Sequence, residues 1–327
     1  MTLNLRTQRI CSRTEITAVG VSTSTTSAPA IFAIYKGAPA TISWIDVFSL
    51  NSGAAISKIS GSAAGFGPST GGASTQQRLA TLRDWSAAIG KAGEEVRYAT
   101  SVLVRDLTAG KTLVEIKNVE RGPIAWSVDG RLIAAAEEGG LRVGVWDARN
   151  GERRGRVMGH NAEVTHARFT PEGRLVTLSK DGVVRMSNIQ RGRTEARLML
   201  PTNGGMPKML ELSEDGRTVM IILGSNVFTW VPEIGTIDSY DMDAKRRTEG
   251  WPLCAGAHGR WVVNRTEDGF DVMDMRSGEV VGEVRRQETE GVTYTSGAWI
   301  EGVGNEGVVV MGRMDGVVEI WDVKVKL

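Results

Sequence analysis

The segment Val143-Gly-Val-Trp-Asp-Ala-Arg-Asn-Gly151 decides the fold of this chain, because its pattern recurs along the sequence. Apolar residues alternate with small or polar ones, as in a half-buried β-strand, and a short turn ending in glycine follows. Copies occur at Ile45–Gly53, Leu103–Gly110 and Val184–Gly192, with weaker ones at Val227–Gly235, Phe270–Gly278 and Val318–Val323. The sequence therefore contains seven copies of one unit.

The copies are regularly spaced. Their equivalent central positions are 48, 105, 146, 187, 230, 273 and 321, and the successive intervals are 57, 41, 41, 43, 43 and 48. A turn followed by an apolar strand precedes several of them: Ser127-Val-Asp-Gly-Arg, Thr170-Pro-Glu-Gly-Arg, Ser213-Glu-Asp-Gly-Arg and His258-Gly-Arg-Trp. The Asp-Gly and Glu-Gly pairs supply the positive φ that tight hairpin turns need. A period of roughly 40 residues indicates a repeat architecture.

These motifs resemble the WD-repeat family, in which each repeat forms a four-stranded antiparallel blade. Trp146-Asp147 and Trp321-Asp322 match the dipeptide that names the family, and Gly159-His160 matches its Gly-His pair. Other repeats depart from the pattern, with Phe48, Arg105, Ser187 and Met273 where Trp would stand. The resemblance covers nearly the whole chain and implies an all-β fold, a single seven-bladed β-propeller over residues 1–327. The expected blades are residues 12–60, 62–118, 119–158, 162–200, 205–246, 250–286 and 291–327, the last completed by residues 2–10.

The seventh blade reaches the end of the sequence with three strands, and we predict that Thr2–Ile10 supplies the fourth. This segment has the alternation of a strand. Pairing it with the last blade would close the ring and remove exposed sheet edges. Arg6, Arg9 and Arg13, with no acidic residue among them, leave a mitochondrial transit peptide as the alternative interpretation.

Composition narrows the function classes. Lys plus Arg number 39 against 38 Asp plus Glu, which argues against a dedicated nucleic-acid binder. Two cysteines, Cys11 and Cys254, cannot build a disulfide framework or a Cys-rich zinc site, and we expect them to be reduced thiols. No run approaches the roughly 18 apolar residues of a membrane span. The expected location is cytoplasmic or nuclear, without membrane contact.

No sequence pattern is typical of catalysis or of cofactor binding. The three histidines, His160, His166 and His258, lack metal-ligand spacing, and no nucleophile elbow is found. A ligand site in the central channel would need converging polar groups on the innermost strands. The segments expected to form the innermost strands are mostly apolar, and their polar exceptions are Thr165, His166 and Glu211. We expect no enzyme activity, catalytic residue, metal, cofactor or small-molecule substrate.

The resemblance also implies a buried hydrogen-bond network within a blade, joining a His, a Ser or Thr, an Asp and a Trp. His160, Ser179 and Asp181 stand at matching positions of the fourth blade, and Ser187 replaces the Trp. Buried polar groups must be paired, and a fully satisfied network makes a blade rigid. We therefore expect a structural role for these three residues.

The remaining interpretation is a scaffold or adaptor that presents the propeller's top face and rim loops to partner proteins. Arg121, Trp251 and Arg313 are the candidates for its binding surface, because Arg and Trp dominate interaction hot spots. Trp251 could equally be a buried anchor of its blade. The insertion Ser86–Thr100 is either a binding loop or a tolerated insertion. Gly61–Gly72 lacks the lysine and helix of a phosphate-binding loop and is interpreted as a flexible connection that runs into the first strand of the second blade.

Two more specific functions stay open. Trp146-Asp147-Ala148-Arg149 resembles the Trp-Asp-x-Arg box of propellers that serve as substrate receptors of cullin-RING ubiquitin ligases, which implies an adaptor contact for Arg149. Asp274-Met275-Arg276 is a partial second copy. The basic pairs Arg246-Arg247 and Arg285-Arg286 allow an RNA-associated propeller in ribosome assembly or RNA processing, although neighbouring acids weaken their field.

Overall fold

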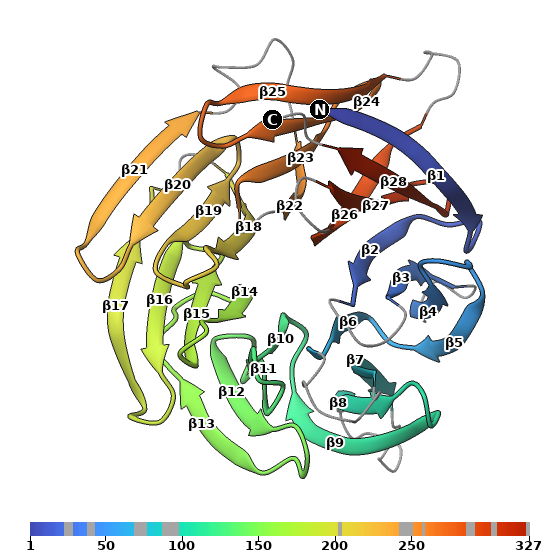
Figure 1. Ribbon diagram of the computed structural model, residues 1–327. Coiled ribbons are helices and arrows are strands. Elements are labelled where there is room, and N and C mark those ends of the chain that lie inside the picture. Colours follow the sequence, from blue (N-terminus) through green and yellow to red (C-terminus); the bar gives the residue numbers. More distant parts are fainter. Residues whose placement is uncertain are drawn as a thin grey trace, which may run out of the picture.

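A computed structural model shows seven four-stranded antiparallel sheets arranged as blades around a central axis (Figure 1). The structure describes residues 1–22, 29–37, 43–68, 77–86, 98–201, 205–241, 251–256, 259–285, 292–301 and 306–324. Every regular element within these ranges is a β-strand. The predicted all-β, seven-bladed propeller is confirmed.

Each blade runs from an innermost strand beside the axis to an outermost strand on the outside of the ring (Figure 1). The innermost strands are β2 (Ile16–Val21), β6 (Ala63–Phe66), β10 (Ile124–Trp126), β14 (Val164–Phe169), β18 (Pro207–Leu212), β22 (Trp251–Gly256) and β26 (Tyr294–Glu301). The second strands are β3 (Ala30–Lys36), β7 (Arg78–Ser86), β11 (Leu132–Glu137), β15 (Arg174–Ser179), β19 (Val219–Leu223), β23 (Trp261–Arg265) and β27 (Glu306–Arg313). The third strands are β4 (Ser43–Ser49), β8 (Tyr98–Asp106), β12 (Arg142–Asp147), β16 (Val183–Asn188), β20 (Asn226–Val231), β24 (Gly269–Asp274) and β28 (Val317–Lys324). The outermost strands are β5 (Ala55–Ser60), β9 (Lys111–Val119), β13 (Arg153–Val157), β17 (Arg193–Met199), β21 (Thr236–Asp241), β25 (Glu279–Arg285) and β1 (Thr2–Ile10).

The order of the strands gives the ring two distinct faces. Because consecutive strands of a blade are antiparallel, their turns alternate between the two ends of the sheet. We call the end with the second-to-third-strand turns and the connections between blades the top face. The end with the first-to-second and third-to-fourth turns is the bottom face.

The ring is closed by strands from both ends of the chain, as predicted. β1 pairs antiparallel with β28, from Thr2 opposite Lys324 to Ile10 opposite Val317. The last sheet therefore has the order β1-β28-β27-β26, and Figure 1 shows β1 along its outer side. With β1 in place, the seventh blade has four strands like the other six.

The seven equivalent positions of the sequence repeat all lie on third strands, next to a recurring irregularity. In six blades the pairing with the outermost strand shifts by one residue at this position. In the third blade, for example, Val145 lies opposite Gly155 but Trp146 lies opposite Arg153. A bulge of this kind bends the strand and increases its twist. The sequence repeat is thus also a repeat in backbone geometry.

The core of the protein lies between the blades. Among the described residues, seven clusters of buried apolar side chains each join two neighbouring blades. Trp146 of the third blade, for instance, packs with Val104 and Ile116 of the second. Burying a side chain of this size stabilises a fold by about 1.5–3 kcal/mol. Each blade therefore depends on both of its neighbours.

The second blade differs from expectation in two places. Gly61–Gly72 is not one connection, because Ala63–Phe66 within it forms the innermost strand β6. Its small residues let the next blade approach: the indole Nε1 of Trp126 donates to the carbonyl of Gly65 at 3.0 Å. The Ser86–Thr100 insertion is partly strand, since Ser86 pairs with Tyr98 and Thr100 pairs with Asp84. Residues 87–97, and 69–72 of the glycine-rich segment, lie outside the described ranges.

Three of the innermost strands share a threonine bulge that the sequence repeat does not indicate. Thr17, Thr165 and Thr295 are each the extra residue of an irregularity between the first and second strands. Each hydroxyl donates to a second-strand carbonyl, at 3.2 Å to Ile34, 3.2 Å to Leu178 and 3.1 Å to Gly312. The hydroxyl thus compensates for ladder bonds that the bulge interrupts.

Candidate functional site

The four residues expected to contact partners lie on two different faces. Arg121 lies in the connection between β9 and β10, Trp251 begins β22, and Arg313 ends β27, so all three are at the top face. Arg149 lies in the turn between β12 and β13, at the bottom face. The side chains of Arg121 and Arg149 are exposed.

Arg313 takes part in a buried network of the seventh blade. Its side chain is 12% exposed, and its Nη1 lies 2.6 Å from the carboxylate of Glu319, which is fully buried. The same carboxylate accepts hydrogen bonds from Tyr294 Oη at 2.7 Å, Trp321 Nε1 at 3.1 Å and Gln8 Nε2 at 3.0 Å. We call Gln8, Tyr294, Arg313, Glu319 and Trp321 the closure cluster, because it joins β1 to three other strands of the blade. The structure thus places Arg313 within the fold.

Trp251 lies at the rim of the channel and is 49% exposed, so the alternative of a buried blade anchor is wrong. The Nζ of Lys208 lies 3.5 Å from the centroid of its ring, and the Cζ of Arg265 lies 5.7 Å away. Lys208 is the extra residue of the innermost-strand bulge in the fifth blade, where three other blades have threonine. We call Lys208, Trp251 and Arg265 the rim cluster. Cation–π attraction holds both cations against the indole.

The polar groups on the channel strands of the fourth and fifth blades are paired with one another. Arg168 of β14 and Glu211 of β18 form an ion pair at 3.0 Å. His166 Nδ1 lies 2.9 Å from the hydroxyl of Thr165. Burial, and then the charge of Arg168, lower the pKa of His166 to about 4. The imidazole is therefore neutral at physiological pH.

The structure brings His160, Ser179 and Asp181 together in the fourth blade. His160 Nδ1 lies 2.8 Å from Ser179 Oγ, which in turn donates to the carboxylate of Asp181 at 2.5 Å. Because the Ser179 proton points to Asp181, the ring donates through Nδ1–H, and its Nε2 accepts from the hydroxyl of Thr177 at 2.8 Å. The Ser187 hydroxyl lies 3.3 Å from Thr194. The neutral ring is satisfied on both nitrogens without a tryptophan.

This arrangement makes the stability of the fourth blade depend on pH. Burial, and then the guanidinium of Arg185, lower the pKa of His160 to about 4, against about 6.5 in an unfolded chain. Stability that is present above pH 6.5 is therefore lost as the pH falls towards 4, because the unfolded state takes up the proton first. We expect His160 to contribute a loss of about 2 kcal/mol between pH 7.5 and pH 5.

The measurement is urea unfolding of the wild type and His160→Asn at both pH values. The variant should be less stable at pH 7.5, and its deficit should shrink by about 2 kcal/mol at pH 5. Carboxylates elsewhere titrate equally in both proteins and cancel in the difference. A deficit that is the same at both pH values would show that the buried ring is not the titrating group.

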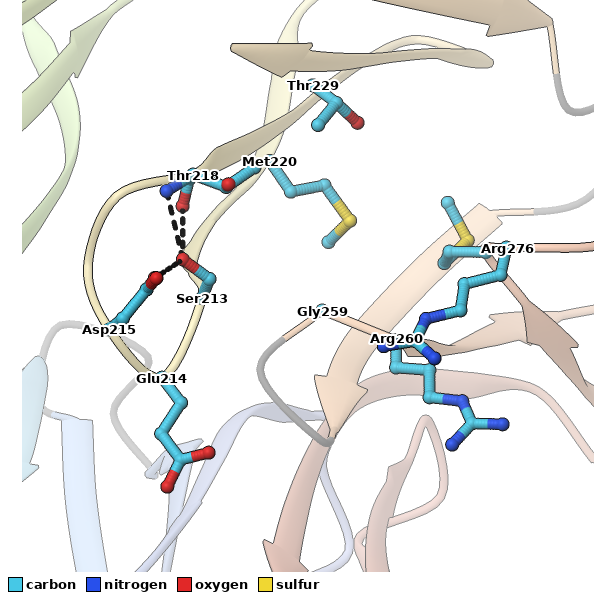
Figure 2. A pocket seen from close by; sticks show the side chains of 10 residues that line it. Ser213, Glu214, Asp215, Thr218, Met220, Thr229, Gly259, Arg260 and Arg276 are labelled. Atoms are coloured by element: carbon cyan, nitrogen blue, oxygen red, sulfur yellow. Dashed lines mark hydrogen bonds between the residues drawn. The ribbon is translucent and has the colours of Figure 1, made fainter. Parts of the chain in front are cut away.

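A cavity of about 660 Å³ opens on the bottom face between the fifth and sixth blades. Figure 2 shows its two walls, one from the turn that joins β18 and β19 and one from the sixth blade. It is lined by Ser213, Glu214, Asp215, Thr218, Met220, Thr229, Gly259, Arg260, Met275 and Arg276. Two motifs noted in the sequence, Ser213-Glu-Asp-Gly-Arg and Asp274-Met275-Arg276, supply residues of both walls, but their spacing does not show that they face each other, because they belong to different repeats.

Other residues singled out in the sequence are placed only in part. Arg285 pairs with Glu283 at 3.0 Å. His258, Arg286 and the pair Arg246-Arg247 lie outside the described ranges. Burial, with smaller contributions from charges, raises the pKa of Cys11 to about 11. That thiol is therefore protonated and a poor nucleophile.

Comparison with protein-family models and with curated proteins finds no match for this chain. In the part of the chain that the structure describes, no helix is long and apolar enough to cross a membrane. The described residues also contain no group of three or more His, Cys, Asp or Glu side chains placed to hold a metal ion. The fold defines the protein as a seven-bladed β-propeller.

Proposed function

We propose that this protein is a non-catalytic binding platform of the WD-repeat type, which holds partner proteins against the top face of its propeller. The observation that carries the proposal is the rim cluster, in which the ring of a half-exposed Trp251 is in cation–π contact with both Lys208 and Arg265. The WD-type repeats support the class, since Trp146-Asp147 and Trp321-Asp322 lie at equivalent third-strand positions of two blades.

The rim cluster has the properties of an interaction hot spot. Tryptophan and arginine dominate the few residues that carry most of the binding energy in protein interfaces. Trp251 belongs to a strand that is paired with β23, and its ring contacts two cations, so little freedom is lost when a partner covers it. Lys208 and Arg265 also give the site a positive charge. The partner that fits is a protein segment with an apolar side chain next to acidic ones.

The test is quantitative affinity purification from native extract with the wild type and Trp251→Ala. We expect at least one stoichiometric partner to be retained about 30-fold less by the variant, since a central Trp contributes about 2 kcal/mol or more. The matched control is Ile234→Ala, which removes an apolar side chain that is 71% exposed in the turn between β20 and β21 on the bottom face. Wild-type protein without a stoichiometric partner, or equal losses in both variants, would refute the proposal.

A further inference from the structure

The cavity between the fifth and sixth blades is a second candidate site, on the face opposite to the rim cluster. Its volume of about 660 Å³ lies within the range of ordinary ligand pockets. The wall from the sixth blade carries Arg260 and Arg276, and the wall from the fifth carries Glu214 (Figure 2). The charges on these walls decide what could occupy it.

Among the described residues, the two arginines of the cavity share a single ion pair, and that pair is long. Arg260 lies over the ring of Trp261, with its Cζ 4.4 Å from the centroid, and its ion-pair partner Asp274 is 3.7 Å from Nη2. Its Nε is buried without a hydrogen-bond partner in the described part of the chain. Asp274 is already used by the turn, because its carboxylate accepts from the backbone N–H of Arg276 at 2.8 Å. Within the described ranges, the exposed side chain of Arg276 makes no ion pair. Both side chains remain accessible, since that of Arg260 is 40% exposed, and an oxyanion in the cavity could pair with both guanidinium groups.

The opposite wall limits how much negative charge the cavity accepts. Asp215 is held in its turn, because it accepts from Ser213 Oγ at 2.6 Å and from the backbone N–H of Arg217 at 3.0 Å. Glu214 beside it is exposed and has no ion pair within the described part of the chain. A polyanion such as RNA would be repelled at this side. A single oxyanion with a cation next to it would match both walls.

The remaining lining suits an aliphatic stem. Met220 and Met275 supply thioether side chains, which adapt to irregular shapes, and Thr229 adds a hydroxyl. We propose that this cavity binds the oxyanion of one side chain, a phosphate or a carboxylate, from a protein segment with a basic residue beside it. Arg260 and Arg276 would bind the oxyanion, and Glu214 the neighbouring cation. This inference does not rest on the rim cluster, so either proposal can fail alone.

The third blade offers a matched control for the arginine pair. Arg131 directly precedes the second strand of the third blade, as Arg260 does in the sixth blade. Arg149 and Arg276 lie at equivalent positions in the turns between the third and outermost strands. The carbonyl of Arg131 accepts from Ala148 at 2.7 Å, as that of Arg260 does from Met275 at 2.8 Å. The backbone N–H of Arg149 donates to Asp147 at 2.9 Å. The same double substitution can therefore be made at equivalent positions of the same face.

The experiment is NMR titration of the full chain, following the Nε–Hε signals of its arginines, with inorganic phosphate, acetate and the dipeptide phosphoseryl-lysine as probes. We expect saturable binding that becomes about tenfold weaker or more in Arg260→Gln/Arg276→Gln, and unchanged binding in Arg131→Gln/Arg149→Gln. Tighter binding of phosphate than of acetate would identify the ligand as a phosphorylated side chain. Tighter binding of acetate would identify it as the carboxylate of an acidic side chain. The dipeptide should bind about two- to fivefold more tightly than phosphate, because its lysine can pair with Glu214. The substitution Glu214→Gln should remove this difference in affinity.

Three results would overturn the proposal. The first is the absence of saturable binding by all three probes. The second is an equal loss in the two double variants, which would mean that repeated surface arginines attract anions without a site. The third is a dipeptide that binds no better than phosphate or that is insensitive to Glu214→Gln, which would remove the neighbouring cation from the proposed ligand.

Discussion

A chain that begins at residue 12 should lose cooperative unfolding, because β1 forms the outer side of the last blade. β1 pairs with β28 along its whole length and contributes Gln8 to the closure cluster. Leu3 also packs against the buried cluster that joins the sixth and seventh blades. We expect a loss of about 5 kcal/mol or more, which is comparable with the whole stability of many domains. An exposed edge on β28 should also promote aggregation.

The measurement is urea unfolding followed by circular dichroism for the full chain and for residues 12–327. Adding a peptide of residues 1–11 should restore the transition in a concentration-dependent manner, because binding to the folded state stabilises it. A peptide carrying Leu3→Asp and Gln8→Ala is the matched control, and it should not restore the transition. An unchanged melting temperature in the truncated chain would show that the ring does not depend on β1.

Replacing Glu319 by alanine should have the second largest effect. The substitution leaves the guanidinium of Arg313, which is 12% exposed, without its buried partner. It also removes the acceptor for Tyr294 and Trp321. Breaking a buried ion pair by removing one partner costs about 3–5 kcal/mol. We expect Glu319→Ala to destabilise the protein by about 4 kcal/mol in urea unfolding.

Asp315→Ala is the matched control for this prediction. Asp315 also pairs with Arg313, but its side chain is 53% exposed. Removing an exposed ion-pair partner of this kind should cost less than about 1 kcal/mol. Since both variants remove one carboxylate from the same arginine, their difference measures the burial of Glu319 together with its hydrogen bonds to Gln8, Tyr294 and Trp321. If the two variants lose the same stability, the closure cluster contributes no more than a surface ion pair.

The fold was predictable because its signals are local and repeated. Each third strand carries its own alternation and turn, so seven degenerate copies were recognisable even where Phe48 or Met273 replaces the tryptophan. The closing strand was predictable from the number of strands in each blade, since the seventh blade has only three strands near the end of the sequence and needs a fourth. By contrast, Ala63–Phe66 was missed, because small residues carry little strand propensity and their role is to admit Trp126 of the next blade.

The sites were less predictable, because they combine residues from distant repeats. Glu319 stands in an ordinary alternating strand, and nothing near it in the sequence announces partners as far away as Gln8. The sequence alone therefore suggests a binding-surface role for Arg313, whereas the structure pairs its guanidinium with that carboxylate. The exposure of Trp251 depends on how two blades meet, and the cavity at Arg260 needs a turn from the preceding repeat. The sequence repeat shows which positions of each blade carry polar or aromatic residues. It does not show which of these residues from different blades face each other.

The pairing of β1 with β28 also bears on how the protein is made. Of the described strands, β1 is synthesised first, and β28, with which it pairs, is synthesised last. Until then the earliest strand has no ladder to join, and the incomplete ring exposes apolar blade surfaces. Contacts between such distant segments form slowly, and unpaired edges are prone to association. Nascent chains of this protein should therefore depend on chaperones until β28 has been synthesised.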